Sequence, residues 1–288
     1  EEMIGQPGSP NLYWALTDLP HPLLDLRKGI QGERLMWKAE FTALLDPYAP
    51  VSPATRRLAQ SLARPPKRLL DDSPPTTDEA RLQKTVGRVY LLLVVLSPGQ
   101  DKPREEAEVR KWLEDRARDD AYMKAARKRL AERGLAADKL RQLAAWQVVL
   151  HNEVLAYEDR NDEAFKAVAL PYWEAAPILE RLGTDQTKGL FGRGANYVEK
   201  VRMAQTRVEQ RLALLRVVEA LRLHAAEHGG TLPAKLADVK LPLPVDPVTG
   251  RPFAYELKDG TAVLRGTPPK GMEKVAVYNV RYEVSIAK

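Results

Sequence analysis

The sequence predicts a mainly α-helical protein that ends in a small antiparallel β-sheet. Two observations lead to this fold class. Apolar residues recur at helical spacing through most of residues 1–228. In residues 229–288, short alternating runs of apolar and polar residues lie between clusters of glycine and proline, which is typical of strands and turns. We therefore expect a multi-helical N-terminal domain and a C-terminal α+β module, in which a long helix precedes the sheet.

The composition is that of a globular protein. The chain has 288 residues, of which 44% are hydrophobic and 29% are charged, so it can bury a substantial core. It contains no cysteine, which excludes disulfide bonds and thiolate metal sites. The longest apolar run, Val89 to Leu96, is far shorter than the roughly 20 residues that span a bilayer. We expect a buried helix there and no crossing of a membrane.

Capping residues, prolines and glycines delimit the helices expected in residues 1–190. The expected helices are Asn11 to Leu19, Asp25 to Leu45, Ala54 to Leu62, Thr77 to Leu96, Pro103 to Gly134 and Asp138 to Tyr157, with shorter helices on either side of Leu170-Pro171. A glycine-rich loop, Gly183 to Gly194, follows them. We place the domain boundary in this loop, between a helical domain of residues 1–190 and a module of residues 191–288.

The C-terminal module begins with one long helix. It should run from about Ala195 to His228, because Gly229-Gly230 supply the left-handed conformation of a helix end. Further on, Asp246 to Gly250 has the composition of a tight turn, and Lys258 to Thr261 has that of a hairpin turn. The expected strands are Phe253 to Leu257, Thr261 to Arg265 and one or two more within Val275 to Ile286.

The segment before the first strand carries an ordered set of turn and aromatic residues: Pro244, Asp246, Pro247, Gly250, Pro252, Phe253 and Tyr255. Following a long helix and Leu232-Pro233, this set resembles the major pseudopilins of type II secretion. The resemblance covers roughly a third of the chain and implies a pseudopilin-like fold, a long helix with a small sheet. Pilus assembly and calcium binding are not implied, because about 190 residues precede the helix and no aspartate follows Asp259.

Three segments, residues 6–16, 170–173 and 211–233, are similar to a group of uncharacterised, exported proteins of planctomycete bacteria. This resemblance implies a setting in the cell envelope, periplasmic or extracellular, and supplies no activity. The chain itself opens with Glu1-Glu2-Met3 and shows no basic and apolar leader. We therefore expect the helical domain to be truncated at its N-terminus.

The sharpest chemical motif is H-x-x-E-H at residues 224–228. Its spacing matches the two metal-binding histidines and the general base of inverted zinc metallopeptidases. However, Gly229 ends the helix immediately, and the residues that follow predict strands rather than a helix with a third ligand. We expect instead that His224 and His228 lie near the negative end of the helix dipole, where cations are favoured. No metal ion or cofactor is expected.

A histidine in the helical domain is the main candidate for acid–base chemistry. His151 lies on the otherwise apolar face of its helix, in line with Glu158 two turns later. A buried histidine with polar neighbours can act as a general base near neutral pH, although a histidine satisfied within the core has the same pattern. Gly189 to Gly194 opens a helix and could bind a phosphate there. It lacks the Lys-Ser/Thr of a P-loop, so an interdomain loop is the simpler interpretation.

The long helix carries two apolar stripes, although packing on one sheet needs only one. The first consists of Val201, Val208, Leu212 and Leu215, and the second of Met203, Leu214, Val217 and Leu221. We expect the second stripe to be an interaction surface that the N-terminal helices or a protein partner cover. A line of basic residues lies between the stripes: Arg193, Lys200, Arg207 and Arg211. This line could follow nucleic-acid phosphates, but basic side chains that lie across a buried seam explain it equally well.

These patterns favour a non-catalytic, exported structural or interaction protein that binds a protein partner or a second copy of itself. The alternative is a hydrolase or other enzyme with a site in the helical domain near His151. A nucleic-acid partner is not expected.

Overall fold

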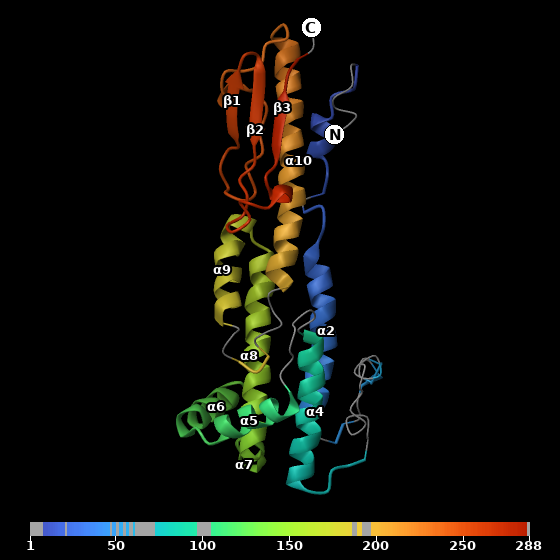
Figure 1. The fold of residues 1–288 in the computed structure, drawn as a ribbon, viewed down its shortest axis with the longest axis vertical. Helices are drawn as coiled ribbons and strands as arrows, with labels where there is room; N and C mark the ends of the chain where they lie inside the picture. The colour runs from blue at the N-terminus through green and yellow to red at the C-terminus, as the bar shows by residue number, and fades with distance from the viewer. Residues whose placement is uncertain are drawn as a thin grey trace. The chain divides into compact units, whose positions relative to one another are not determined.

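The protein is mainly helical, with one small antiparallel sheet near the C-terminus, as expected for the fold class (Figure 1). The computed structural model describes residues 8–20, 22–46, 48–49, 52–53, 56–57, 60, 73–96, 105–185, 189–191 and 197–286. The helices are α1 (Tyr13–Thr17), α2 (Leu26–Leu45), α4 (Asp78–Leu96), α5 (Glu106–Ala117), α6 (Asp120–Glu132), α7 (Ala137–Gln142), α8 (Ala145–Val168), α9 (Tyr172–Asp185) and α10 (Tyr197–Glu227). The strands are β1 (Ala254–Lys258), β2 (Thr261–Arg265) and β3 (Arg281–Val284).

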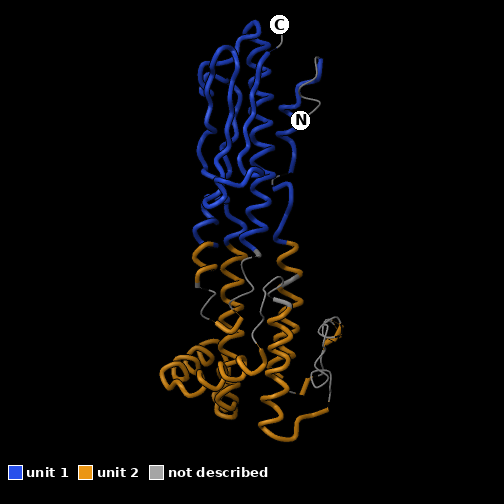
Figure 2. Tube along the Cα trace, in the orientation of Figure 1, with its two compact units in different colours: residues 1–27, 167–179, 198–288 blue, residues 28–166, 180–197 orange. Residues whose placement is uncertain are grey.

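The chain divides into two compact units, each built from separate segments of sequence (Figure 2). Unit 1 contains residues 1–27, 167–179 and 198–288, and unit 2 contains residues 28–166 and 180–197. The expected domains, residues 1–190 and 191–288, divide the chain differently. The expected boundary assigns residues 1–27 and 167–179 to the helical domain, whereas both segments belong to unit 1, which contains the sheet.

The sheet of unit 1 has the strand order β1-β2-β3, with antiparallel neighbours. Asp259 and Gly260 form the two-residue turn between β1 and β2, and their φ angles are 50° and 78°. A type I′ hairpin turn requires positive φ at both positions, which explains why these two residue types stand there. The expected hairpin is confirmed. Within Val275 to Ile286, a short 3-10 helix, Ala276–Tyr278, precedes β3, so this region supplies one strand.

The C-terminal half of α10 packs against this sheet (Figure 1). Leu214, Val217 and Leu221 are fully buried and share a core with Phe253 and Leu264. Burial of each such side chain stabilises the unit by about 1.5–3 kcal/mol. The stripe that the sequence analysis assigned to an interaction surface therefore faces the interior of unit 1, and its fourth member, Met203, is buried as well. The stripe was expected to be covered by the N-terminal helices or by a partner, and in the structure the sheet region covers it together with Tyr13 of α1.

A short N-terminal segment is bound along α10. The fully buried Glu219 accepts hydrogen bonds from the backbone N–H of Leu12 and from the guanidinium of Arg222, both at 2.7 Å. The Asn11 side chain donates to the backbone carbonyl of Glu219 at 2.9 Å. Tyr13 is only 1% exposed, and its hydroxyl donates to the carbonyl of Pro242 at 2.5 Å. These contacts explain why the first residues of the chain belong to unit 1.

Asp246 organises the turn that precedes β1. Its buried carboxylate accepts hydrogen bonds from the backbone N–H groups of Val248 at 2.9 Å and Thr267 at 2.8 Å, and from the Gln210 amide at 2.9 Å. Gly250 ends the turn with a φ of 68°, and its N–H donates to the Asp246 carbonyl at 2.8 Å. The expected tight turn is confirmed.

The core of unit 2 contains an aromatic cluster from α2, α8 and the segment after α9. The ring of Phe41 lies 4.9 Å from that of Tyr157 and 5.0 Å from that of Phe191, measured between centroids. The buried Arg88 of α4 donates to the carbonyls of Ala43 and Asp46 at 3.1 Å each. Because the last carbonyls of a helix have no partner within it, this guanidinium caps the end of α2.

Two of the expected helices are broken in the structure. Pro103 to Gly134 contains α5 and α6, because the Asp119 carboxylate accepts the N–H of Tyr122 at 3.0 Å and starts a new helix. Asp138 to Tyr157 contains α7 and the start of α8, because the backbone turns at Leu143. The expected helix Ala54 to Leu62 falls mainly outside the described residues. Among the helices that the structure describes, none is both long enough and apolar enough to cross a membrane.

Candidate functional site

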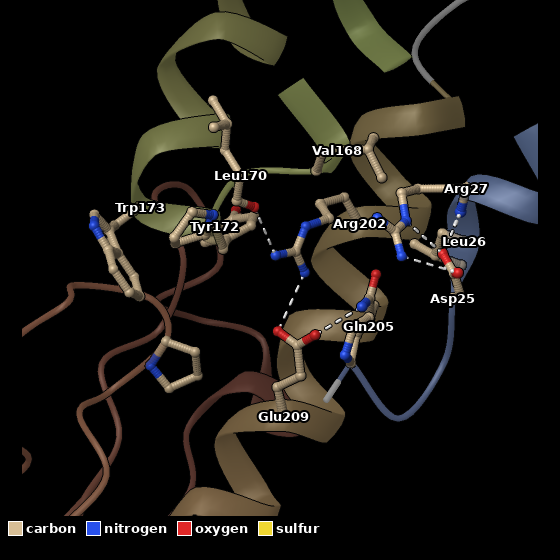
Figure 3. A pocket seen from close by; sticks show the side chains of 14 residues that line it. Asp25, Leu26, Arg27, Val168, Leu170, Tyr172, Trp173, Arg202, Gln205 and Glu209 are labelled. Atoms are coloured by element: carbon tan, nitrogen blue, oxygen red, sulfur yellow. Dashed lines mark hydrogen bonds and ion pairs between the residues drawn. The ribbon is translucent and has the colours of Figure 1, made fainter. Parts of the chain in front are cut away.

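A pocket of about 260 Å³ lies within unit 1, beside the N-terminal half of α10 (Figure 3). Its lining comes from four parts of the unit: the residues around the start of α2, the connection between α8 and α9, one face of α10, and Pro247 of the Asp246 turn. Residues that are far apart in sequence thus converge on one small volume. Most of them are apolar, and a few buried polar side chains on α10 form one wall.

Arg202 is the central polar residue of this wall. Its guanidinium donates to the Leu170 carbonyl at 3.2 Å, to the Thr206 hydroxyl at 3.1 Å and to the Glu209 carboxylate at 3.2 Å. The side chains of Arg202 and Glu209 are only 6% and 8% exposed, so their ion pair is almost fully removed from water. Arg202 also lies 5.9 Å from the centroid of the Tyr172 ring, within range of a cation–π contact.

Gln205 lies one turn after Arg202 and is nearly buried as well. Its Nε2 donates to the Glu209 carboxylate at 2.7 Å, which fixes the orientation of the amide, because a flipped amide would place two acceptors against each other. Its Oε1 is buried and has no hydrogen-bond donor, and the Nε of Arg202 has no acceptor. Both atoms are buried beneath the surface of the pocket.

A second ion pair lies on the other side of Gln205. The Arg27 Nε donates to the Asp25 carboxylate at 2.8 Å, and Figure 3 shows this pair opposite Glu209. Two arginines thus stand beside two carboxylates around the pocket. Because the charges cancel in pairs, the site has no net charge to attract a strongly charged ligand.

Trp173 forms the exposed edge of the pocket. It is 37% exposed, and its indole packs on Gly250 so closely that a β-carbon there would meet ring atoms at 2.9 Å. Trp173 belongs to the Leu170-Pro171-Tyr172-Trp173 segment, on which one of the sequence resemblances rested. In the structure, this segment supplies a carbonyl, two aromatic rings and a proline to the pocket.

The acid–base candidates His151 and Glu158 line a different cavity, of about 300 Å³, within unit 2. Burial lowers the pKa of His151, so its imidazole is neutral near pH 7. The hydroxyl of Thr42, which also lines the cavity, donates to the carbonyl of Lys38 at 2.8 Å. The structure thus brings a neutral histidine and a carboxylate to one cavity, and the hydroxyl group beside them is bound to the backbone.

His224 and His228 lie at the C-terminal end of α10 with stacked rings. Their centroids are 4.0 Å apart, and their planes differ by 10°. The Nδ1 of His228 lies 2.7 Å from the carbonyl oxygen of His224, so this nitrogen donates a hydrogen bond to the backbone. In the described parts of the chain, no group of three or more histidine, cysteine, aspartate or glutamate side chains could hold a metal ion.

The structure describes only part of the glycine-rich loop and of the line of basic residues on α10. Leu190 is buried, and its N–H donates to the Glu153 carboxylate at 2.7 Å, so this amide is not available to a phosphate. Along α10, Lys200 and Arg211 are exposed, whereas the Arg207 guanidinium lies 5.5 Å from the centroid of the Tyr278 ring. Arg193 and residues 192–196 fall outside the described part.

The pocket residues Arg202, Gln205 and Glu209 were missed in the sequence analysis. Their spacing of three and seven residues places them on one face of a helix, and this face also carries buried side chains. Three polar residues on one face of an otherwise buried helix could have indicated this site in the sequence. Comparisons of the chain with protein-family models, with curated proteins and with solved structures find no match.

Proposed function

We propose that this protein is a non-catalytic, exported structural or interaction protein of the bacterial cell envelope. One observation carries the proposal. Three buried acidic residues of the described chain, Glu153, Glu219 and Asp246, each accept a hydrogen bond from the backbone N–H of a distant segment. The distances are 2.7 Å from Leu190, 2.7 Å from Leu12 and 2.8 Å from Thr267.

Carboxylates used in this way fix the course of the chain. A catalytic acid or base must exchange its proton with a substrate, whereas the oxygens of these carboxylates are engaged by donors of the fold itself. We further propose that unit 1 is pseudopilin-like, and the packing of α10 on the three-stranded sheet supports this. The exported setting rests on the resemblance of the sequence to exported planctomycete proteins.

The effect of these carboxylates on stability tests the proposal. Glu153→Gln, Glu219→Gln and Asp246→Asn should each lower the free energy of unfolding by about 1–3 kcal/mol, because a buried charge-assisted hydrogen bond is weakened. The matched control is Glu132→Gln, whose side chain is 63% exposed and 3.8 Å from Lys128, and which should change stability by less than about 0.5 kcal/mol. A variant that becomes more stable would indicate a strained catalytic group and contradict the proposal.

The alternative function is a hydrolase or other enzyme with its site at the His151 cavity. It is favoured by the presence of a neutral imidazole and the Glu158 carboxylate in the lining of one cavity of unit 2. Purified protein should be tested with p-nitrophenyl esters of short acids. Turnover that disappears in a folded His151→Gln variant would establish this alternative in place of the structural role.

A further inference from the structure

We propose that the N-terminal segment of the chain, residues 9–17, docks on α10 of a second copy, so that two copies exchange these segments and form a dimer. This inference rests on the proposed interaction role and names the partner as a second copy of the chain. Three observations carry it: the contacts that hold the segment, the exposed apolar side chains of the connector that follows it, and the long separation in sequence between the segment and α10.

The segment itself shows what the surface of α10 recognises, because it lies along this helix (Figure 1). The Ser9 carbonyl accepts a hydrogen bond from Arg222 at 2.9 Å, and the Leu12 N–H donates to the buried Glu219 carboxylate at 2.7 Å. The buried ring of Tyr13 is part of the core that α10 shares with the sheet. A second copy carries the same segment, so it can supply every one of these contacts without any change in α10.

The connector between α1 and α2, residues 18–25, leaves apolar side chains uncovered. Leu19, Leu23 and Leu24 are 38%, 39% and 52% exposed, and Trp14 in α1 is 62% exposed. Four of the twelve large hydrophobic side chains that are exposed in the described chain thus fall within residues 14–24. Such side chains need no explanation when they are scattered singly, whereas a local concentration indicates an interaction site. In an exchanged dimer the two connectors cross, and their leucines cover one another.

The connector has the backbone of a hinge. Pro20 and Pro22 have no N–H to donate and hold φ near −65°, so they prevent α1 from continuing and keep the chain extended. A connector of this length spans up to about 26 Å, which allows it to cross to a second copy. Exchange of a terminal segment is a low-cost route to a dimer, because the closed monomer and the exchanged dimer contain the same contacts of the segment.

The segment is not close in sequence to the helix that it binds. Asn11 and Glu219 are 208 positions apart, and unit 2 lies between them in the chain. The entropic cost of closing a loop grows with its length, so in a concentrated solution of unfolded chains the α10 of another copy competes with that of the same chain. We therefore expect exchange during refolding at high concentration. Exchange between folded monomers should be slow, because the segment has to leave its site first.

Single introduced cysteines can report the exchange, because the chain contains no cysteine. Ala226 is exposed and lies one turn after Arg222, which binds the Ser9 carbonyl. Equal amounts of Ser9→Cys and Ala226→Cys protein should be unfolded in urea, refolded together at high concentration and treated with a short bis-maleimide. Neither variant can crosslink within one molecule. The control replaces Ser9→Cys by Lys128→Cys, an exposed position in unit 2, and measures chance crosslinking. We expect several-fold more covalent pairs of the two variants than in this control.

A substitution in the connector tests what stabilises the dimer. Leu24→Ser should raise the dissociation constant of the dimer at least about tenfold, corresponding to about 1.4 kcal/mol, because this exposed side chain gains its contacts only in the dimer. The matched control is Leu35→Ser, at a position of α2 that is 71% exposed and lies outside the connector, and it should leave the constant unchanged. Size-exclusion chromatography with light scattering, after refolding at a series of concentrations, measures both constants.

Three results would overturn the exchange. They are covalent pairs no more frequent than in the control, refolded protein that stays monomeric at every concentration, and a dimer that Leu24→Ser leaves unchanged. None of them affects the stability test of Glu153, Glu219 and Asp246, because Glu219 has the same hydrogen bonds in the closed monomer and in the exchanged dimer. The two proposals can therefore fail separately.

Discussion

The indole of Trp173 lies directly over the backbone of Gly250, and a β-carbon at Gly250 would come within 2.9 Å of two ring atoms. Gly250 also has a φ of 68°, a backbone conformation that residues other than glycine rarely adopt. The turn before β1 and the exposed edge of the pocket therefore depend on the same residue. A substitution at this position should disturb both.

Gly250→Ala should lower the free energy of unfolding by more than the strain of a positive φ, which is about 1–2 kcal/mol. The matched control is Gly271→Ala, because Gly271 has a φ of 80° and a β-carbon added there would meet no other atom within 4 Å. Gly250→Ala should lower the free energy of unfolding more than Gly271→Ala does, because only Gly250→Ala creates a clash with Trp173. Urea unfolding of both variants measures this difference. If Trp173→Ala does not reduce the cost of Gly250→Ala, the indole does not lie over the turn.

Tyr13 should be essential for the attachment of the N-terminal segment. Tyr13→Ala removes a buried ring and its hydrogen bond to Pro242, and should cost about 3–5 kcal/mol, as large-to-small core substitutions of aromatic residues do. Trp14→Ala is the neighbouring control, at a position that is 62% exposed, and should change stability little. Limited proteolysis should release the first residues of Tyr13→Ala first. Equal cleavage of the two variants would show that this segment is not held by Tyr13.

The pKa of His151 makes stability depend on pH in a defined direction. Burial lowers this pKa, so the unfolded chain, with a histidine pKa of about 6.5, binds the proton more readily than the folded protein does. Above about pH 6.5 the imidazole is neutral in both states and has no effect. As the pH falls below that value, the free energy of unfolding should decrease until the lower pKa of the folded state is reached. His151→Gln should lose less stability between pH 7 and pH 5 in urea unfolding, and an identical loss in both proteins would contradict the burial of the ring.

The histidine pair at the end of α10 should not hold a stoichiometric metal ion. In the described part of the chain, no histidine, cysteine, aspartate or glutamate completes a group of three ligands with these two histidines. Elemental analysis of protein purified without an affinity tag should find less than one equivalent of zinc and of calcium. A full equivalent of zinc that disappears in His224→Ala would instead favour the peptidase interpretation.

Features with local causes could be predicted from the sequence. Asp259-Gly260 predicted the hairpin because the turn depends on two adjacent residues, and Gly229-Gly230 predicted the end of α10 for the same reason. The break between α5 and α6 was missed because Asp119 caps a helix within a run of charged residues, without the glycine or proline that usually marks an end. The sequence did not show which stripe of α10 faces the sheet, because the two stripes are equally apolar.

The pocket could not be predicted, because its geometry depends on contacts between distant segments. Arg202 obtains one of its acceptors from Leu170, and Gln205 lies near the ion pair of Asp25 and Arg27. Nothing in the residues around position 202 specifies either neighbour. His151 and Glu158 were predicted on one helix face, and the cavity in front of them comes from residues of α2 and α6.

The attachment of Asn11 to Glu219 also sets an order of events during synthesis. The two residues are separated by 208 positions, and a ribosome that adds about 5–20 residues per second needs on the order of 10–40 s to make that interval. Asn11, Leu12 and Tyr13 therefore have no α10 to bind while unit 2 leaves the ribosome. Residues 28–166 and 180–197, which make up unit 2, are all synthesised before Glu219. Unit 1 is completed last, when α10 and the sheet emerge and the start of the chain closes onto them.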